Sequence, residues 1–194
     1  MREMVGNTLI AIAHDAILAG LGEPLRGADE QQRWLHEKGA TFVTLNRRQQ
    51  LRGCMGSLQA HRVLLADIKA NAAAAAFRDP RFPPLEIREL DEIEIEVSLL
   101  SALEPVIYEN EQHALRQLRP GIDGVLLEFG AQRGTFLPQV WGHFSDTASF
   151  LRQLKQKAGL PADFWHDDIR LQRYSVEKFK QSDLPLTAAA EGMR

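Results

Sequence analysis

An α+β fold is predicted by three features of this 194-residue sequence. Two segments are typical of β-hairpins, and a helical segment follows each of them. One further segment alternates apolar and polar residues as a half-buried strand does. This order is neither a regular βαβ series nor all-β, and a hydrophobic content of 44% suffices for a sizeable core.

The first predicted helix follows from apolar residues at helical spacing between Val5 and Ala19, and it ends at Gly20 and Gly22. A polar connector with a helical turn around Trp34 comes next. Two strand-like segments then flank the polar tip "RRQQ", which predicts the first hairpin. The segments are residues 40–46 and 51–58.

The alanine-rich segment 62–77 predicts a helix that packs close to a sheet, because the small alanine side chains let the helix backbone approach the strands. Three prolines end this helix within "RDPRFPPL". The segment 91–101 alternates cleanly, with Ile95 on one side and Glu96 on the other, and predicts a half-buried strand.

The second half repeats the hairpin-then-helix order, which suggests an internal duplication. Asp146 or Thr147 is the predicted N-cap of its long helix, and Gly159 ends that helix. The predicted elements are a helix at 109–119, a hairpin from 124–130 and 135–141, a helix at 146–159 and a final strand at 169–179.

Composition excludes several classes of protein. A net charge of −3 and a pI near 6.1 give no general attraction to nucleic acid or to anionic membranes. The local cluster of Arg47, Arg48 and Arg52 is interpreted as a solvated hairpin tip. The N-terminus does not resemble a signal peptide, and no long uncharged segment predicts a membrane span, so a cytoplasmic location is expected.

Motifs for common cofactors are missing from the sequence. The six histidines form no HExxH or i, i+4 pair, and one cysteine makes neither a zinc-binding pattern nor an internal disulfide. Neither a GxGxxG, a Walker loop nor a GxSxG segment occurs. No metal and no cofactor are therefore predicted, and the sequence does not indicate an oligomeric state.

The single cysteine lies in "LRGCMGSL" between two glycines. In an extended strand Arg52 projects to the same face as Cys54, and a neighbouring cation favours the reactive thiolate. Gly53 and Gly56 weaken a strand and commonly mark a bulge or a close approach, so we expect them to leave room beside the sulfur. The alternative is a structural thiol, because free cysteine is among the most buried residue types.

His61 is the candidate base for this thiol. It lies seven residues after Cys54, and a turn in "SLQAH" would bring it back toward the end of the strand. The alternative is an exposed histidine near the start of the next helix.

Three further polar residues are candidates for binding. Asn71 shares a helical stripe with Asp67, from which it would hydrogen-bond toward the sheet, and Arg81 sits in the proline-stiffened loop as a possible anion-binding group. The alternative for both is that they satisfy backbone groups where the loop meets the sheet. Glu96 is interpreted as part of a solvated strand face, or as lining a polar cavity in a curled sheet.

Five motifs together resemble the AMMECR-one domain family, whose bacterial members are called protein A of the AmmeMemoRadiSam system. They are "LRGCMGSL", "NAAAAAFRDPRFPPL", "IEVSLLS", "GTFLPQVW" and "KAGLP". The resemblance implies an α+β fold with two intertwined β–α repeats around one barrel-like mixed sheet. It implies one domain over residues 1–181, with interlocked subdomains near 1–100 and 101–181, and residues 182–194 are expected to form a flexible tail.

The resemblance also implies functional positions and partners. Arg52, Gly53, Cys54 and Gly56 match the family's signature segment, and four more residues match family-typical polar positions: Asn71, Asp79, Arg81 and Glu96. Members of the family are associated with a Memo-like protein and a radical-SAM protein. Two hypotheses follow: a cysteine-dependent enzyme or enzyme component acting on a small anionic or carbonyl-bearing substrate, or a non-catalytic adaptor that binds these partners.

Overall fold

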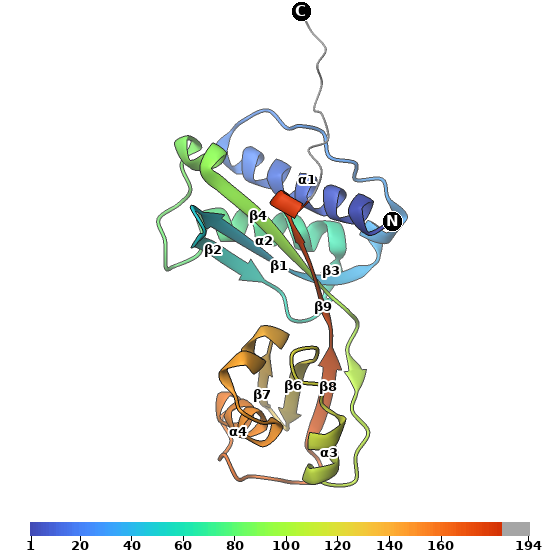
Figure 1. Cartoon of the computed structure of the whole chain (residues 1–194). Helices are drawn as coiled ribbons and strands as arrows, with labels where there is room; N and C mark the ends of the chain where they lie inside the picture. The colour runs from blue at the N-terminus through green and yellow to red at the C-terminus, as the bar shows by residue number, and fades with distance from the viewer. Residues whose placement is uncertain (184–194) are drawn as a thin grey trace, which may run out of the picture. The chain divides into compact units, whose positions relative to one another are not determined.

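The computed structural model describes residues 1–183 and has the predicted α+β class. The chain forms two compact units (Figure 1). Of the described residues, unit 1 consists of Met1–Leu99 together with residues 177–183, and unit 2 consists of Leu100–Val176. Of the tail expected from residue 182, all but the first two residues lie outside the described residues, and these two end a short 3₁₀ turn, η4 (Gln181–Asp183).

Unit 1 is a sheet with two long helices. Its helices are α1 (Arg2–Leu21) and α2 (Leu64–Phe77), with short 3₁₀ turns η1 (Arg33–His36) and η2 (Ile87–Glu92). Its strands are β1 (Lys38–Arg47), β2 (Gln50–Gly56), β3 (Arg62–Val63), β4 (Ile93–Leu100) and β9 (Val176–Lys180). The strand order is β2-β1-β4-β9, and β3 pairs with β1, so β2 is an edge strand.

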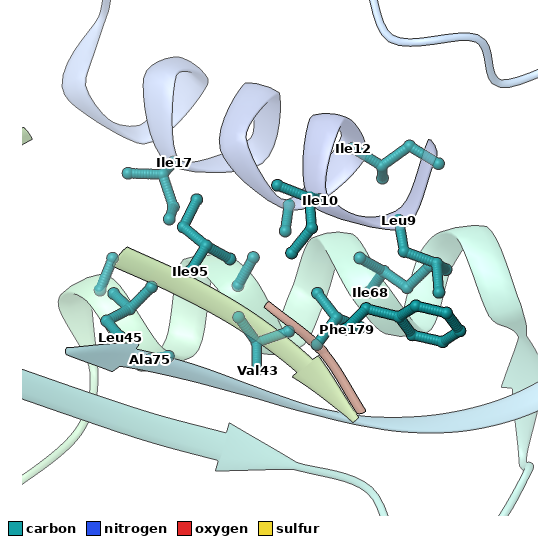
Figure 2. Close-up of a cluster of buried hydrophobic side chains, with 14 of the residues drawn as sticks. Leu9, Ile10, Ile12, Ile17, Val43, Leu45, Ile68, Ala75, Ile95 and Phe179 are labelled. Carbon is teal, nitrogen blue, oxygen red and sulfur yellow. The ribbon is translucent and has the colours of Figure 1, made fainter. Parts of the chain in front are cut away.

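The core of unit 1 fills the space between the helices and one face of this sheet. Figure 2 shows side chains of α1 and α2 meeting Val43, Leu45 and Ile95 from the strands. The next residues along β1 and β4, Thr44 and Glu96, therefore belong to the opposite, helix-free face.

The helix α1 is long and apolar enough to cross a membrane by length and composition, and it is the one such helix in residues 1–183. Half of its most apolar window is buried inside the unit. Leu9, Ile12 and Ile17 are fully buried in the core of unit 1, as expected of the core helix of a globular domain.

Unit 2 has a separate core around its own sheet. The strands are β5 (Glu104–Pro105), β6 (Gly124–Phe129), β7 (Gln132–Phe136) and β8 (Arg170–Tyr174), in the order β5-β8-β6-β7. The helices are α3 (Glu111–Gln117) and α4 (Thr147–Lys157), with the 3₁₀ turn η3 (Pro138–His143). Asp146 is the N-cap of α4 and accepts a hydrogen bond from Ser149 N at 2.7 Å, which decides between the two predicted caps.

Three expectations about the strands need correction. The barrel-like sheet implied by the family resemblance is replaced by two open sheets, each with its own hydrophobic cluster. The final strand is divided into β8 and β9, which belong to different sheets. The predicted strand 135–141 stops at Phe136, because Pro138 begins η3 and cannot donate to a strand ladder.

The tip of the first hairpin is exposed, as expected, and its arginines form ion pairs, whereas Arg52 of the same cluster is buried. Arg47 contacts Glu89 at 3.2 Å and Glu92 at 3.0 Å, and Arg48 contacts Glu92 at 2.9 Å. The two turn residues, Arg48 and Gln49, have φ angles of 51° and 66°. Side chains other than glycine rarely adopt this left-handed region, so the turn is strained.

This strain predicts that Gln49→Gly stabilises the protein. Glycine adopts positive φ without the steric cost, and we expect a gain of about 0.5–1 kcal/mol in the free energy of unfolding by urea. Gln50→Gly is the matched control, because Gln50 is an exposed residue of β2 with ordinary φ. Glycine there should destabilise the protein, and a loss of stability in Gln49→Gly as well would contradict the argument.

Candidate functional site

The backbone of Cys54 is held by the loop that follows α2. Cys54 N donates a hydrogen bond to the Asp79 carboxylate at 2.9 Å, and Cys54 O accepts one from Arg81 Nη2 at 3.4 Å. Because β2 is an edge strand, these two groups have no further strand to pair with. The loop therefore takes the place of a neighbouring strand at Cys54.

Asp79 and Arg81 form the centre of this contact. The Asp79 carboxylate is 4% exposed and accepts three hydrogen bonds from Arg81, at 2.7, 2.9 and 3.1 Å. These bonds, with the one from Cys54 N, hold the pKa of Asp79 well below its usual range. The Asp79–Arg81 clamp is thus a charged, rigid contact between the loop and the strand.

The thiol of Cys54 lies on the helix-free face of the sheet and is half-buried. Thr44, directly opposite on β1, donates a hydrogen bond from Oγ1 to the sulfur at 3.4 Å. The pKa of Arg81 is raised, mainly by its bonds to Asp79 and in a smaller part by Cys54. Arg81 is thus the cation that contacts Cys54 directly, through the hydrogen bond to its backbone oxygen.

Arg52 is directed elsewhere, because β2 has a bulge at this residue. Leu45 pairs with Gly53 and Asn46 pairs with Leu51, so Arg52 is the extra residue between them. Its guanidinium is buried and binds Glu89 through two hydrogen bonds of 2.8 and 2.9 Å. Glu89 therefore neutralises the positive charge that the sequence suggested for the thiol.

The glycines beside Cys54 allow close packing and do not simply leave room at the sulfur, as we had expected. A Cβ on Gly53 would lie 2.1 Å from the backbone oxygen of Ala75 in α2. A Cβ on Gly56 would lie 2.3 Å from the Phe42 ring and 2.7 Å from Thr41 O. Both positions are closed to a larger residue unless the backbone moves.

Asn71 contributes to a buried polar network between α2 and the sheet. Asp67 is fully buried and accepts hydrogen bonds from four residues: Thr41, Ser57, Arg62 and Asn71. Asn71 Nδ2 also donates to Thr41 O at 3.0 Å, which confirms the expected hydrogen bond toward the sheet. The amide thus satisfies a strand backbone group, which is the structural alternative for this residue.

The remaining candidates lie in different surroundings. Glu96 has a side chain that is 12% exposed and pairs with Lys178 of β9 at 3.3 Å, so it is neither free nor fully solvated. His61 is exposed, and its Nδ1 lies 3.0 Å from Gln59 O. None of the contacts found in residues 1–183 joins His61 to Cys54.

Sequence reasoning missed Glu89 and Thr44, and it did not single out Asp67 or Asp79 for the roles they have. Asp67 carries a usable signal, since it is an acidic residue on a helix whose neighbours are mainly alanine and leucine. Glu89 carries no such signal within "REL". Within the described part of the chain, no group of three or more His, Cys, Asp or Glu side chains is arranged to hold a metal ion.

These features define a class: an α+β protein with an Arg-Gly-Cys edge strand that an Asp-Pro-Arg loop clamps. The family model described as AMMECR1 matches residues 10–179, and the chain belongs to this family.

Relatives from archaea match nearly the whole chain. A protein of Methanothermobacter thermautotrophicus is 37% identical over 182 residues, covering 91% of this chain and 94% of its own length. A protein of Thermococcus gammatolerans is 39% identical, covering 91% and 90%. The crystal structure of uncharacterized protein PH0010 from Pyrococcus horikoshii aligns with a TM-score of 0.76 at 33% identity, covering 93% and 94%.

The contact at Gly53 predicts that Gly53→Ala destabilises the protein by about 1–3 kcal/mol or more, since backbone of α2 or β2 has to move. Gly142→Ala is the matched control, because a Cβ there meets nothing within 4 Å and Gly142 is not among the positive-φ glycines. Chemical denaturation measures both changes. Equal stability of the two variants would show that β2 and α2 are not closely packed.

The Arg52–Glu89 pair predicts a pH dependence. Hydrogen bonds from Arg52 lower the pKa of Glu89 from its ordinary 4.5 to about 2. Because this folded-state pKa is depressed, the pair stabilises the fold above about pH 4.5, and this contribution is lost as the pH falls toward about 2.

We therefore expect Glu89→Gln to lower the free energy of unfolding at pH 7 and to reduce its further loss between pH 5 and pH 2. Urea unfolding at a series of pH values measures both effects. Glu37→Gln, at an exposed position, is the control and should keep the wild-type profile. A wild-type pH slope in Glu89→Gln would contradict the assignment.

Proposed function

We propose that this protein is a cysteine-dependent enzyme component in which Cys54 reacts with a small anionic or carbonyl-bearing substrate. One observation carries the proposal: the loop after α2 binds both the backbone N–H and the backbone C=O of Cys54, while the residue remains half-buried with its thiol on the helix-free face. A nucleophile benefits from a fixed position, because a small displacement of a reacting group lowers the rate strongly.

The residues around the thiol have separable roles in this proposal. Thr44 donates to the sulfur and stabilises negative charge on it, since hydrogen bonding to a charged form favours that form. Arg81 is the cation that binds the anionic group of the substrate, because half of its side chain is exposed while its Nε and Nη2 are held by Asp79.

Arg52 has a supporting role in the proposal. Its guanidinium faces Glu89 and the backbone of Pro84, and so positions β2 against the segment 84–89. His61 has no assigned role in the described conformation. The thiol of Cys54 therefore gives its proton to the substrate or to solvent.

A non-catalytic adaptor is the second candidate, with a Memo-like protein and a radical-SAM protein as its partners. Exposed apolar side chains at both ends of the Cys54 strand favour it: Leu51 is 42% exposed and Leu58 is 38% exposed. Ile87, at the start of the turn that carries Glu89, is 52% exposed. Exposed apolar patches with polar groups at their rim mark protein-binding surfaces.

Thiol labelling tests the first candidate. We expect iodoacetamide to label Cys54 in the native protein at pH 7.5, and Arg81→Met to lower the labelling rate severalfold because a nearby cation is lost. Arg52→Met is the matched arginine variant, and at equal folded fraction it should label nearly as fast as the wild type. Mass spectrometry of the modified peptide gives both rates.

The outcomes separate the two candidates. Labelling that requires denaturant would exclude a reactive thiol and favour the adaptor. In that case Leu51→Asp with Ile87→Asp should abolish co-purification with a Memo-like or radical-SAM partner, while Cys54→Ser should leave it intact. Slower labelling in Arg52→Met than in Arg81→Met would instead return the activating role to Arg52.

A further inference from the structure

Unit 2 has a pocket of about 440 Å³ whose lining residues lie between positions 105 and 172. It is formed by the chain that continues from β5, by one residue of β6 and by the segment that enters β8. The lining residues are Pro105, Val106, Ile107, Tyr108, Glu128, Asp167, Ile169, Arg170, Leu171 and Gln172. Its volume lies within the roughly 300–1,000 Å³ of small-molecule sites.

The floor of the pocket is the face of the sheet that the helices of unit 2 leave uncovered. Leu127 and Leu171 face the hydrophobic core shared with α4. Their neighbours along the strands, Glu128 and Arg170, stand directly opposite each other in the β6–β8 pairing and project the other way. Two opposite charges therefore lie side by side at the base of the pocket.

Several polar groups of the pocket have no partner within residues 1–183. Neither the Arg170 guanidinium, the Asp167 carboxylate nor the Gln172 amide makes an ion pair or a side-chain hydrogen bond there, in contrast to Arg173, which pairs with Glu104. Glu128 has one contact, a 3.5 Å ion pair with Arg133. One cation, one amide and two carboxylates are thus available to a ligand.

One wall of the pocket is apolar and fixed in place. Val106 N donates to Leu171 O at 2.9 Å, and the Tyr108 hydroxyl donates to Ile169 O, so the chain beyond β5 is fastened to the edge of β8. Ile107 lies between these two anchors and is 77% exposed. Because Ile107 is exposed and its segment is fixed at both ends, its side chain is available for contact with an apolar group of a ligand.

From this arrangement we propose that the pocket binds a small zwitterion with an apolar side chain, such as a free aliphatic α-amino acid. The ligand carboxylate pairs with Arg170 and accepts from Gln172, the ammonium pairs with Asp167 and Glu128, and the aliphatic group rests against Ile107 and Tyr108. A chain terminus of a protein supplies only one of the two charges, so a free small molecule is the better fit. The pocket belongs to unit 2 and Cys54 to unit 1, so this proposal does not rest on the proposed function.

Titration of the full-length protein with L-leucine, followed by two-dimensional NMR of backbone amides, tests the proposal. We expect shifts confined to residues 104–108, residue 128 and residues 167–172, with a dissociation constant in the millimolar range, because the pocket is open and the ligand is small. Leucinamide lacks the carboxylate and N-acetylleucine lacks the ammonium. Each should bind at least fivefold more weakly than leucine.

Variants make the test specific. Arg170→Gln should weaken leucine binding at least fivefold, while Arg152→Gln, at an exposed position of α4 outside the pocket, should leave it unchanged. If Arg170→Gln does not fold, Asp167→Asn replaces it, since Asp167 is exposed. The proposal is overturned if about 10 mM leucine shifts none of these amides, if both charge-deleted analogues bind as tightly as leucine, or if the pocket variant binds like the wild type.

Discussion

The attachment of the loop and turn after α2 to the edge strand β2 is the contact on which the Cys54 site depends. Asp79 and Glu89, both nearly buried, make this attachment by binding Cys54 N and Arg52 respectively. A buried carboxylate is stable only where charged or hydrogen-bonding partners surround it. Each carboxylate has an arginine and at least one backbone N–H, so the position of the strand is determined by charge as well as by packing.

The same strand is fixed from its other side by the helix α2. The alanine-rich surface of this helix comes so close to β2 that residue 53 has no space for a side chain. Farther along the helix, Asp67 and Asn71 bind the backbone of Thr41 in the neighbouring strand β1 and the hydroxyl of Ser57, which directly follows β2. The segment from Arg52 to Ser57 is therefore held by the helix on one side and by the clamp loop at its edge, and Cys54 presents its thiol to the helix-free face.

Much of the fold was predictable because its signals are local. Helical spacing, the αL glycine at position 22 and the Asp146 cap all act within one or two turns, and the corresponding helices occur where the sequence predicted them. The sequence predicted strand boundaries wrongly where contacts with distant parts of the chain determine them. The division of the last strand into β8 and β9 and the early end of β7 depend on which sheet each residue joins. The alternation of apolar and polar residues in the sequence does not show this, because it is the same whichever sheet a strand belongs to.

The site was predicted less well, for a related reason. Cys54, Arg52 and Arg81 were found from residue types and from the family motifs, but an ideal strand was assumed, and the bulge at Arg52 breaks its alternation. Glu89 lies 37 residues from Arg52, and no spacing rule connects the two. Glycines near a reactive residue are also ambiguous in a sequence, because close packing of a helix and access for a ligand require the same small residue.

The central claim is that Asp79 holds the backbone at Cys54, and hydrogen exchange of the Cys54 amide tests it most directly. In an edge strand this N–H would exchange rapidly unless a side chain accepts its hydrogen bond. We expect strong protection in the wild type, loss of most of it in Asp79→Ala, and unchanged protection in Asp91→Ala, which replaces an exposed aspartate of η2. Fast exchange in the wild type, or equal protection in Asp79→Ala, would contradict the account.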